Sequence, residues 1–586
     1  MNLETVQVFS ARAKASMPTY FPGTDKGRRE SALCKHRWLG WLLAALIVAV
    51  IAGQTTHNTG SDPRGTLLVS EAIAQHGTIK LDAYGKTLLD SYGYVIHRKG
   101  EHFYNYFPLG TALVSTPFVA IANAFGFNMA KDEPLIQMVL ATLAALLITF
   151  ILYKTARLYL RKTESLLLAG LCWFGSSLAS TVGTALWSHD FALVFSSAAI
   201  FLVLRQRQPE SLLAPALIGL CLFTAYLCRP TLALLSPFLL LYYFLQDKKS
   251  ALFAAATLSL LLLGFMGWSM HEFAQILPDY YLPKRLEGGD VATALYGNLL
   301  SPARGLWVYS PFLLASVLLT LLLAPRNKTL AKLSLITLAW PIVHLFSVSQ
   351  FPHWWAGWSF GSRLMVDALP GLFLGLFGGL AALHQRKSLA YAAVLVSGLF
   401  AIYVNTYQAL FNPYGMQWNV QPNVDHYPEY LFDWRYPQFL HSKGRHEERL
   451  AEFRSHQLPP FSGLIDIPYD SALAAFDSFY GLEAGFRWSE GKNASLSLML
   501  GEQDLIGEAN LHAGFLGDQA LTIKLNGQQV FEGRFAGGER EIRFSFAPKL
   551  LHAGLNTFTF HLPDAHKPAS EDPRVLAMAF RRLSLR

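Results

Sequence analysis

The feature that most constrains the fold of this chain is its alternation of long apolar runs with polar connections. Of the 586 residues, 52% are hydrophobic and 15% are charged, whereas soluble domains carry roughly 25% charged residues. The runs are long enough to cross a bilayer core of about 30 Å as helices rising about 1.5 Å per residue. The sequence therefore predicts an α-helical polytopic membrane protein with about eleven transmembrane helices. The predicted spans are residues 38–54, 134–153, 164–186, 190–204, 211–228, 231–246, 250–270, 309–324, 332–350, 365–384 and 388–406.

The polar connections are of two kinds. Some are short and basic, and the others hold nearly every aromatic or charged cluster, including residues 61–64, 104–108, 187–190 and 354–363. Because Lys and Arg mark cytoplasmic loops, a cytoplasmic N-terminus places the basic connections inside and the decorated loops outside. We therefore predict a multi-pass protein of the cell's inner (plasma) membrane, with its reactive groups facing outward. The basic connections are residues 154–162, 205–207, 248–249, 326–332 and 386–387.

Outward-facing chemistry restricts the substrates. Nucleotide-activated compounds are cytoplasmic, so we expect a substrate that is delivered by lipid. The net charge of +8 comes largely from the connections and from a basic tail at residues 1–37. It fits the predicted topology and attraction to anionic headgroups, and we expect no nucleic-acid partner. A cleaved signal peptide is the alternative for the N-terminal segment, although its apolar stretch would begin unusually late.

The predicted transmembrane bundle covers residues 38–406 and has two large outer loops, at residues 55–133 and 271–308. The first loop contains one more apolar stretch, residues 109–126, which would spoil the topology if it crossed the membrane. This stretch contains Pro117 and follows an aromatic loop. We predict that it forms a juxtamembrane or re-entrant helix over the outer face.

The C-terminal part of the chain has a different pattern. Residues 407–469 are rich in aromatic residues, Pro and Asn, and we interpret them as an extracytoplasmic connection. From residue 470 to 586 apolar residues alternate with a period of two, and Asn526-Gly527 is a strong hairpin signal. This pattern predicts a periplasmic or extracellular β-sandwich, jelly-roll-like, without cysteines and therefore without disulfides. The alternating positions include Leu496, Leu498, Leu500, Leu521, Ile523, Leu525, Ile542, Phe544, Phe546, Phe558, Phe560, Leu562, Leu576, Met578 and Phe580.

The first candidate for chemistry is Asp62, which follows the first predicted span by a few residues. A carboxylate at the boundary between headgroups and apolar chains can act as a general base toward a hydroxyl. Arg64, two residues later, is a candidate for substrate binding. The alternative is an Asx-Pro turn in which Asp62 merely starts a helix at Pro63.

Three further clusters lie in the predicted outer turns of the first half. Tyr104 and Tyr106, in a run with Asn105, suit sugar recognition but equally suit an interfacial aromatic belt. His189 is a candidate for hydrogen bonding to substrate, and metal ligation is the alternative, without a second His or Cys at ligand spacing. Arg229 lies at a depth that is costly unless it is paired or solvated. A phosphate is one partner, and snorkelling to the interface is the alternative.

The second half of the bundle holds two more clusters. Lys284, Arg285 and Arg304 supply three cations to the second outer loop, and Arg forms bidentate contacts with phosphate. Residues 354–363 contain three Trp within five residues, interleaved with glycines, and end at Arg363 where the next predicted span begins. This density exceeds the needs of an aromatic belt. The candidates for substrate binding here are Trp355 and Trp358.

These elements, in this order, resemble the membrane glycosyltransferases of the C-type fold that use polyprenyl-phosphate sugars. The resemblance covers about residues 38–465. It rests on Asp62 in a long first outer loop, on the number of spans, and on the stretches WSH (187–189), LSPARGL (300–306) and WAGWSFGSR (355–363). Relatives often carry an Asp-Glu pair in the first loop, whereas this chain has Asp62-Pro63. That departure argues against the protein-mannosylating branch.

The resemblance implies a function. The chain would move a sugar from a polyprenyl-phosphate-linked donor to a glycan, lipid or protein acceptor on the outer face of the membrane, with inversion. Asp62 would be the general base, and Arg363, helped by Arg229, Arg304 or Lys284-Arg285, would neutralise the leaving phosphate. No metal or other cofactor is required by this chemistry, although a divalent metal is compatible with it.

The aromatic candidates would border the sugar and the acceptor, and the C-terminal sandwich would either bind acceptor glycan or serve as a packing domain. Two other functions remain open. A transporter or flippase for lipid-linked glycans predicts charges inside spans and internal repeats. A polymerase or ligase of preassembled glycans would differ mainly in the size of the acceptor.

Overall fold

The computed structural model of the chain describes residues 26–206, 211–383, 387–458, 460–461, 465–483, 485–501, 507–568 and 574–586. It divides into two compact units, residues 1–416 and 417–586, and each is described by itself. Most of the predicted tail, residues 1–25, lies outside the described residues, as do Arg207 and Arg386 of the basic connections.

The first unit is a bundle of helices, of which six in the described residues are long and apolar enough to cross a membrane. This is consistent with an integral membrane protein, while the count of eleven spans stays a prediction. The six are α6 (Met129–Ala156), α9 (Ser188–Arg205), α12 (Lys248–Phe273) and the continuous helical segments Lys328–Ser349, Arg363–Ala382 and Ser388–Phe411. Shorter apolar helices are Trp38–Gly53, Leu109–Ala124, Leu213–Cys228, Pro230–Phe244, Val291–Leu300 and Leu313–Arg326.

The remaining elements of this unit connect and cover those helices. They are α2 (Lys26–Gly53), α3 (Thr66–His76), α4 (Lys86–Asp90), β1 (Ile96–Lys99), β2 (His102–Asn105), α5 (Leu109–Ala124), α7 (Lys162–Phe174), α8 (Ser177–Val182), α10 (Leu213–Cys228), η3 (Pro230–Leu234), α11 (Leu235–Phe244), η4 (Asp279–Tyr281), η5 (Pro283–Leu286), α13 (Val291–Leu300), α14 (Leu306–Tyr309), α15 (Leu313–Leu323), η6 (Ala324–Arg326), α16 (Lys328–Ser334), η7 (Leu335–Ala339), α17 (Trp340–Ser349), η8 (Arg363–Ala368), α18 (Leu369–Ala382), α19 (Lys387–Ile402), η9 (Tyr403–Phe411) and α20 (Pro413–Gln417).

The predicted span at residues 164–186 is corrected by the structure, because it is two helices, α7 and α8, separated at Gly175 and Ser176. Backbone groups freed at membrane depth must be bonded within the protein. Here the carbonyl of Gly175 accepts hydrogen bonds from Ser310 and from Asn405, at 2.9 and 3.2 Å. The break is therefore compensated by side chains from the segment between α14 and α15 and from η9.

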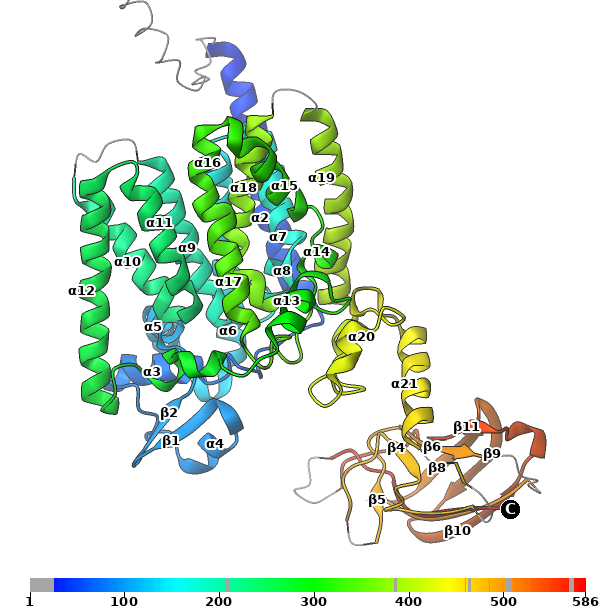
Figure 1. The fold of residues 1–586 in the computed structure, drawn as a ribbon. Coiled ribbons are helices and arrows are strands. Elements are labelled where there is room, and N and C mark those ends of the chain that lie inside the picture. The colour runs from blue at the N-terminus through cyan, green and yellow to red at the C-terminus, as the bar shows by residue number, and fades with distance from the viewer. Residues whose placement is uncertain are drawn as a thin grey trace, which may run out of the picture. The chain divides into compact units, whose positions relative to one another are not determined.

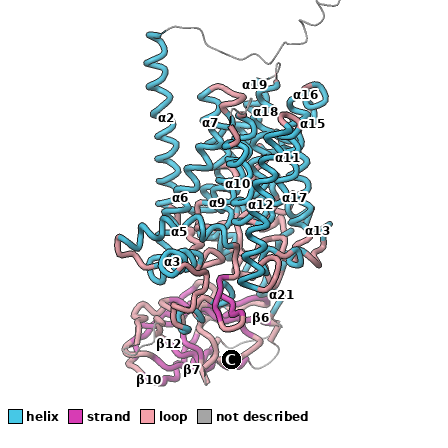
Figure 2. Tube along the Cα trace, turned by 90° about the vertical axis from the view of Figure 1, so that its left-hand side faces the viewer, coloured by secondary structure: helices cyan, strands magenta, loops and turns pink. Residues whose placement is uncertain are grey.

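The two ends of the bundle carry different connections. The segment joining α15 to α16 and the turn between α6 and α7 carry basic connections and lie at one end, whereas α3, β1 and β2 lie at the other (Figures 1 and 2). Both α3 and α5 lie across the ends of the long helices rather than along them (Figures 1 and 2). This placement of α5 agrees with the prediction of a covering helix at residues 109–126.

The segment formed by η8 and α18 occupies the centre of the bundle, and 94% of its apolar window is buried. Its glycines allow neighbours to approach closely. A Cβ on Gly375 would lie 2.4 Å from the Oγ of Ser316 on α15, so only glycine fits. The central position of this segment brings its first residues, Arg363–Ala368, to the same end of the bundle as α3.

The second unit confirms the predicted antiparallel β-domain. One sheet has the order β10-β7-β12-β3, with β5 pairing to β12, and the other has the order β4-β6-β11-β8-β9. Apolar side chains of both sheets form one core. The first strand begins at Ile465, slightly before the predicted boundary at residue 470. The strands are β3 (Ile465–Pro468), β4 (Ala474–Asp477), β5 (Arg487–Trp488), β6 (Asn493–Leu500), β7 (Glu508–Phe515), β8 (Gln519–Leu525), β9 (Gln528–Phe535), β10 (Gly538–Ser545), β11 (Gly554–His561) and β12 (Met578–Leu585).

The predicted hairpin at Asn526-Gly527 joins β8 to β9, and both residues have a positive φ, of 50° and 84°. These are the angles that a two-residue turn of this kind needs. Helices in this unit are η10 (Pro428–Phe432), η11 (Gln438–Leu440), α21 (Lys443–Gln457) and η12 (Pro548–Leu550).

The start of α5 generates a prediction about stability. A Cβ on Gly110 would lie 2.3 Å from the backbone nitrogen of Cys228, at the end of α10. Gly110→Ala should therefore destabilise the bundle by about 1–3 kcal/mol, as overpacking does. Thermal unfolding of the purified protein in nanodiscs measures the effect. Gly264→Ala on α12 is the matched control, since a Cβ there meets nothing within 4 Å. Equal melting temperatures for the two variants would contradict the packing described.

Candidate active site

The site is centred on an ion pair between Asp62 and Arg363, which are 301 residues apart in the chain. The Nη2 of Arg363 lies 2.7 Å from the Oδ2 of Asp62. The other carboxylate oxygen accepts a hydrogen bond from the hydroxyl of Tyr94 at 2.8 Å. The guanidinium of Arg363 lies over the ring of Trp187, 3.8 Å from its centroid. Both oxygens of Asp62 are thus engaged, and Arg363 is held between a carboxylate and an indole.

The loop that carries Asp62 is fixed from beneath by α6. The buried carboxylate of Glu133 accepts hydrogen bonds from the backbone nitrogens of Gly65 and Leu67, at 2.9 and 3.0 Å. The amide of Gln137 donates to the carbonyl of Pro63 at 3.2 Å. The N-cap of α3 is Gly65 in the left-handed region, not Asp62. The carboxylate of Asp62 is therefore free of a capping role and is directed to Arg363.

The electrostatics of Asp62 follow from these contacts. Burial favours a higher pKa, but the charge and hydrogen bond of Arg363, together with the hydrogen bond from Tyr94, outweigh it and hold the pKa of the Asp62 carboxyl below its ordinary value. Burial and the neighbouring Asp62 raise the pKa of Tyr94 to about 12. At neutral pH the site therefore holds a carboxylate and a neutral phenol.

A second ion pair lies deeper and organises Arg229. The buried carboxylate of Asp367, on η8, accepts from the Nε of Arg229 at 3.1 Å and from the hydroxyl of Thr231 at 2.7 Å. Its other oxygen lies 2.7 Å from the Nδ1 of His189. The Nη1 of Arg229 then reaches Ser188 at 3.3 Å. An unpaired Arg would be costly at this depth, and Asp367 provides its partner.

The two ion pairs meet at one small pocket. Its lining includes Asp62, Arg363, Arg229, Trp187 and Tyr280. The hydroxyl of Tyr280 lies 3.5 Å from Arg229, so this ring forms part of the pocket wall beside the second cation.

A second pocket of about 260 Å³ adjoins the first, because Arg229 and Tyr280 line both. Its remaining wall is mostly apolar and includes Tyr226, Leu282 and Phe351, with Arg285 as a second cation. The guanidinium of Arg285 lies 3.6 Å from the centroid of the Tyr280 ring. The arrangement combines two cations with an apolar groove.

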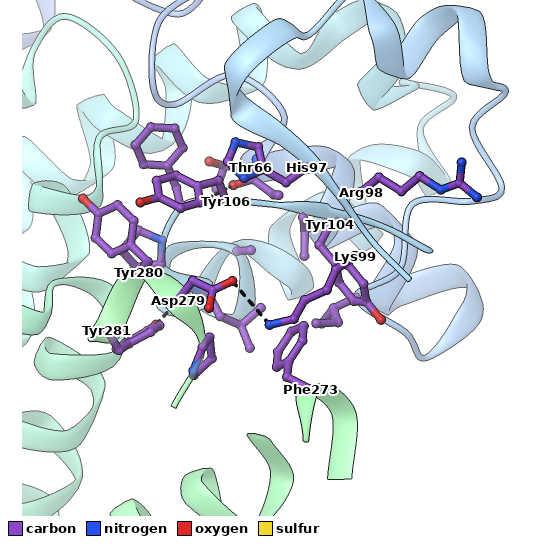
Figure 3. Close-up of a pocket in the computed structure, with 18 of the residues that line it drawn as sticks. Thr66, His97, Arg98, Lys99, Tyr104, Tyr106, Phe273, Asp279, Tyr280 and Tyr281 are labelled. Carbon is purple, nitrogen blue, oxygen red and sulfur yellow. Dashed lines mark hydrogen bonds and ion pairs between the residues drawn. The ribbon is translucent and has the colours of Figure 1, made fainter. Parts of the chain in front are cut away.

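A third pocket of about 230 Å³ adjoins the first on another side, through Thr66, Phe107 and Tyr280. Figure 3 shows it between the β1–β2 hairpin and the segment that follows α12. Its walls include Tyr106, which is stacked on His97 with ring centroids 4.6 Å apart. The three pockets therefore meet around Tyr280.

The predicted site residues are distributed over these features. Asp62, Arg363 and Arg229 meet at the first pocket, Arg285 lines the second, and Tyr104 and Tyr106 line the third. The buried His189 contacts Asp367. The hydroxyl of Tyr104 donates to Glu272 at 2.9 Å, and burial and this carboxylate raise the pKa of Tyr104.

Other predicted residues lie elsewhere. Arg304 is buried, and three of its nitrogens donate to the carbonyls of Ala303, Trp355 and Gly357, at 2.8 to 2.9 Å. Its contacts shape the loop of the Trp cluster. Trp355 is buried and Trp358 is 48% exposed, and neither lines the three pockets described above.

Arg64 and Lys284 are also outside those pockets. The guanidinium of Arg64 lies over Tyr92, 4.1 Å from the ring centroid, and donates to the carbonyl of Ser91 at 2.9 Å. Lys284 is an exposed residue on η5.

Four residues of the site were not assigned a role by sequence analysis: Tyr94, Trp187, Tyr280 and Asp367. For Asp367 a signal existed, since a carboxylate inside the predicted span 365–384 marks a functional or paired position. The same holds for Asp190, which is fully buried in the first turn of α9. The roles of the three aromatic residues depend on partners distant in sequence, although Trp187 belongs to the cluster 187–190 and to the stretch WSH.

Metal ligands are not gathered in the part of the chain that the structure describes. No group of three or more His, Cys, Asp or Glu side chains among those residues is placed to hold a metal ion. The nearest arrangement, His189 with Asp367, is a hydrogen-bonded pair that also holds Arg229.

Comparisons with known proteins give the following. No protein-family model and no curated protein matches the chain. Its structure is similar to that of the oligosaccharyltransferase of Archaeoglobus fulgidus, with 11% identity and a TM-score of 0.44 over 67% of this chain and 57% of that chain. It is also similar to that of the arabinosyltransferase EmbB of Mycobacterium smegmatis, with 11% identity and a TM-score of 0.37 over 99% of this chain and 67% of that chain. A third similar structure is ArnT of Cupriavidus metallidurans bound to undecaprenyl phosphate, with 14% identity and a TM-score of 0.36 over 72% of this chain and 81% of that chain.

These are membrane glycosyltransferases of the C-type fold, and the similarity to them is one of low identity. The chain spans less than two thirds of the oligosaccharyltransferase. All three TM-scores lie below 0.5, so these similarities do not assign a function to the site.

The buried pair of Arg229 and Asp367 generates a second prediction about stability. Asp367→Ala leaves a buried guanidinium without its carboxylate, which typically costs about 3–5 kcal/mol. Glu101→Ala is the matched control, because it breaks an exposed pair with Arg98 in which the Glu101 side chain is 88% exposed. Thermal unfolding in nanodiscs should show a large loss for the first variant and little change for the second. Similar melting temperatures would contradict the role given to Asp367.

Proposed function

We propose that this chain is a membrane glycosyltransferase that moves a sugar from a polyprenyl-phosphate donor to an acceptor hydroxyl. The observation that carries the proposal is the pocket in which the carboxylate of Asp62 faces two arginines, Arg363 and Arg229, at one end of an apolar bundle. A base and an anion-binding pair side by side are what such a transfer needs. The adjoining apolar groove suits the donor's hydrocarbon chain.

The donor phosphate would bind between the arginines. Arg363 uses one nitrogen for Asp62, and its buried Nε has no hydrogen-bond partner among the described residues. Arg229 is oriented by Asp367 so that its Nη1 points toward Ser188 and Tyr280. Charge-assisted bonds from two guanidinium groups are well suited to phosphate. The prenyl chain would lie in the second pocket, along apolar side chains such as Leu282 and Phe351.

The reaction balances within this arrangement. The acceptor hydroxyl transfers its proton to Asp62 while its oxygen forms a bond to the anomeric carbon of the donor sugar. The bond from that carbon to the phosphate oxygen breaks, and its electron pair leaves with the polyprenyl phosphate. Attack opposite the leaving group inverts the anomeric configuration. Arg363 and Arg229 stabilise the charge that develops on the departing oxygen, which is usually the largest single contribution.

The ion pair also couples donor binding to the base. Without donor, Arg363 and Tyr94 occupy the two oxygens of Asp62, so the carboxylate is a poor proton acceptor. A bound phosphate competes for the guanidinium of Arg363 and adds a negative charge nearby. Both changes raise the pKa of Asp62 and free one oxygen for the acceptor hydroxyl. The base would thus become effective only when donor is present.

The remaining parts of the proposal concern location. The end of the bundle with the site would face the outside of the inner membrane, the N-terminus would be cytoplasmic, and the C-terminal β-domain would be extracytoplasmic. The polarity of the connections supports this orientation, since the basic ones gather at the opposite end of the bundle (Figures 1 and 2). The acceptor would then be a glycan, a lipid or a protein of the cell envelope.

The function is tested by Asp62→Asn, which preserves size and removes basicity. In proteoliposomes supplied with polyprenyl-phosphate sugars and with envelope glycolipids as acceptors, we expect transfer to fall by about 10²–10⁴-fold, the usual contribution of a general base. Asp90→Asn, an exposed carboxylate of the same loop, is the matched control and should retain activity. Transfer within a few-fold of the unaltered protein would remove Asp62 from the mechanism. A wild-type protein that moves intact lipid-linked glycan across the bilayer without transfer would favour a flippase.

The proposed coupling between donor binding and the pKa of Asp62 predicts different pH profiles for kcat/KM and for kcat. In the donor-free protein Arg363 holds the pKa of Asp62 below its ordinary value, so kcat/KM for the donor, which reports the free protein, should fall only at strongly acidic pH. In the donor complex the pKa is higher, and kcat should begin to fall at a higher pH. Rates measured across acidic pH, with melting temperatures as a control for unfolding, give both profiles. If the two pH profiles coincide, or if kcat/KM begins to fall at a higher pH than kcat, bound donor does not displace Arg363 from Asp62.

A further inference from the structure

The third pocket, between the β1–β2 hairpin and the segment after α12, adjoins the site and is lined by the candidate sugar-binding residues Tyr104 and Tyr106 (Figure 3). It shares Thr66, Phe107 and Tyr280 with the pocket of Asp62 and Arg363. The two pockets are therefore neighbours. The donor groove adjoins the same pocket through Arg229 and Tyr280, and it shares Tyr280 and Tyr281 with the third pocket.

The walls of this pocket have the composition of a carbohydrate site. Aromatic side chains dominate it, including Tyr104, Tyr106, Trp268 and Phe273, and they offer apolar faces and edges to the C–H groups of a sugar ring. Asn105 and Asp279 add polar groups that can fix hydroxyls. At about 230 Å³, the pocket lies just below the range of drug-sized ligands. It suits one sugar residue rather than an extended chain.

The charges indicate which kind of sugar. Lys99 reaches across the pocket to Asp279, 3.3 Å away, so the two charges compensate each other (Figure 3). Arg98 points away from the cavity in Figure 3, and it pairs with Glu101 at 3.3 Å. Both lysine and arginine of the lining are thus engaged with carboxylates. An acidic sugar would have to break one of these pairs, whereas an uncharged sugar would not.

We propose that this pocket binds the acceptor as an uncharged sugar residue whose hydroxyl is presented to Asp62. The role of this sugar as acceptor rests on the proposed transfer, whereas the binding of an uncharged sugar does not depend on that function. The sugar can belong to a glycolipid or to a free glycan, since in either case the pocket would recognise the sugar ring and its hydroxyls.

Binding is tested without any donor. Saturation-transfer difference NMR on the protein in nanodiscs uses the methyl glycosides of glucose, mannose, galactose, arabinose and N-acetylglucosamine, with methyl glucuronoside as the charged probe. At least one uncharged glycoside should bind, and the glucuronoside should not. Tyr106→Ala should weaken binding by about tenfold, and Tyr106→Leu, which keeps apolar volume, should do the same without unfolding the hairpin. Phe125→Ala is the matched control, an 81% exposed aromatic just beyond α5.

A charge variant sharpens the assignment. Asp279→Asn removes the partner of Lys99 while keeping its size, so the freed ammonium should now admit methyl glucuronoside. The proposal is overturned if no uncharged glycoside binds, if the Tyr106 variants bind like the control, or if the glucuronoside binds the unaltered protein best. It is also overturned if Asp279→Asn leaves the glucuronoside unbound.

The transfer assay shows whether the pocket binds the acceptor or the donor sugar, and whether the acceptor is a glycolipid or a free glycan. Tyr106→Leu should raise KM for the acceptor about tenfold and leave KM for the donor unchanged, and the opposite pattern would make this the donor-sugar site. Glycolipid and delipidated glycan, compared as acceptors, distinguish the sources. Sugar binding in the pocket without any transfer would refute the proposed function alone, and transfer that ignores Tyr106 would refute the pocket alone.

Discussion

The arrangement of this molecule depends on how charges are held at one end of an apolar bundle. Arg229 and Arg363 lie where a lone cation would be costly, and each is compensated by a carboxylate, Asp367 or Asp62. Asp367 sits at the start of the central, almost wholly buried helical segment, so the position of that segment decides where Arg229 can be. The site is therefore built on the best-packed element of the bundle.

The two ion pairs are unequal in a way that suits their proposed roles. Asp367 is fully buried and accepts from Arg229, Thr231 and His189, so both of its oxygens are engaged within the protein. Asp62 is 29% exposed and lies in a pocket wall, so its partner can be exchanged for a ligand. One pair holds the geometry, and the other is placed to respond to an anion. Three pockets converge on Tyr280, which would let the proposed donor and acceptor meet beside Asp62.

Much of the architecture is readable from the chain. The apolar runs, the basic connections at one end and the period-two pattern after residue 470 all correspond to observed features, and Asn526-Gly527 forms the hairpin turn that its residue types predict. These predictions succeed because hydrophobic period and turn chemistry are local properties. The interrupted helix at Gly175 was not predicted, since its compensation comes from Ser310 and Asn405, more than a hundred residues away.

The candidate site, too, was predictable from the sequence only in part. The sequence by itself determined that Asp62, Arg229 and Arg363 are charged residues at one end of an apolar bundle, because charge against apolar context is visible along the chain. Only the tertiary structure decided that Asp62 pairs with Arg363, that Asp367 holds Arg229, and that Arg304 is occupied by backbone carbonyls of the Trp cluster. The physical reason is that each of these pairings joins residues far apart in sequence, and burial makes every such group find a partner that only the packed bundle can supply.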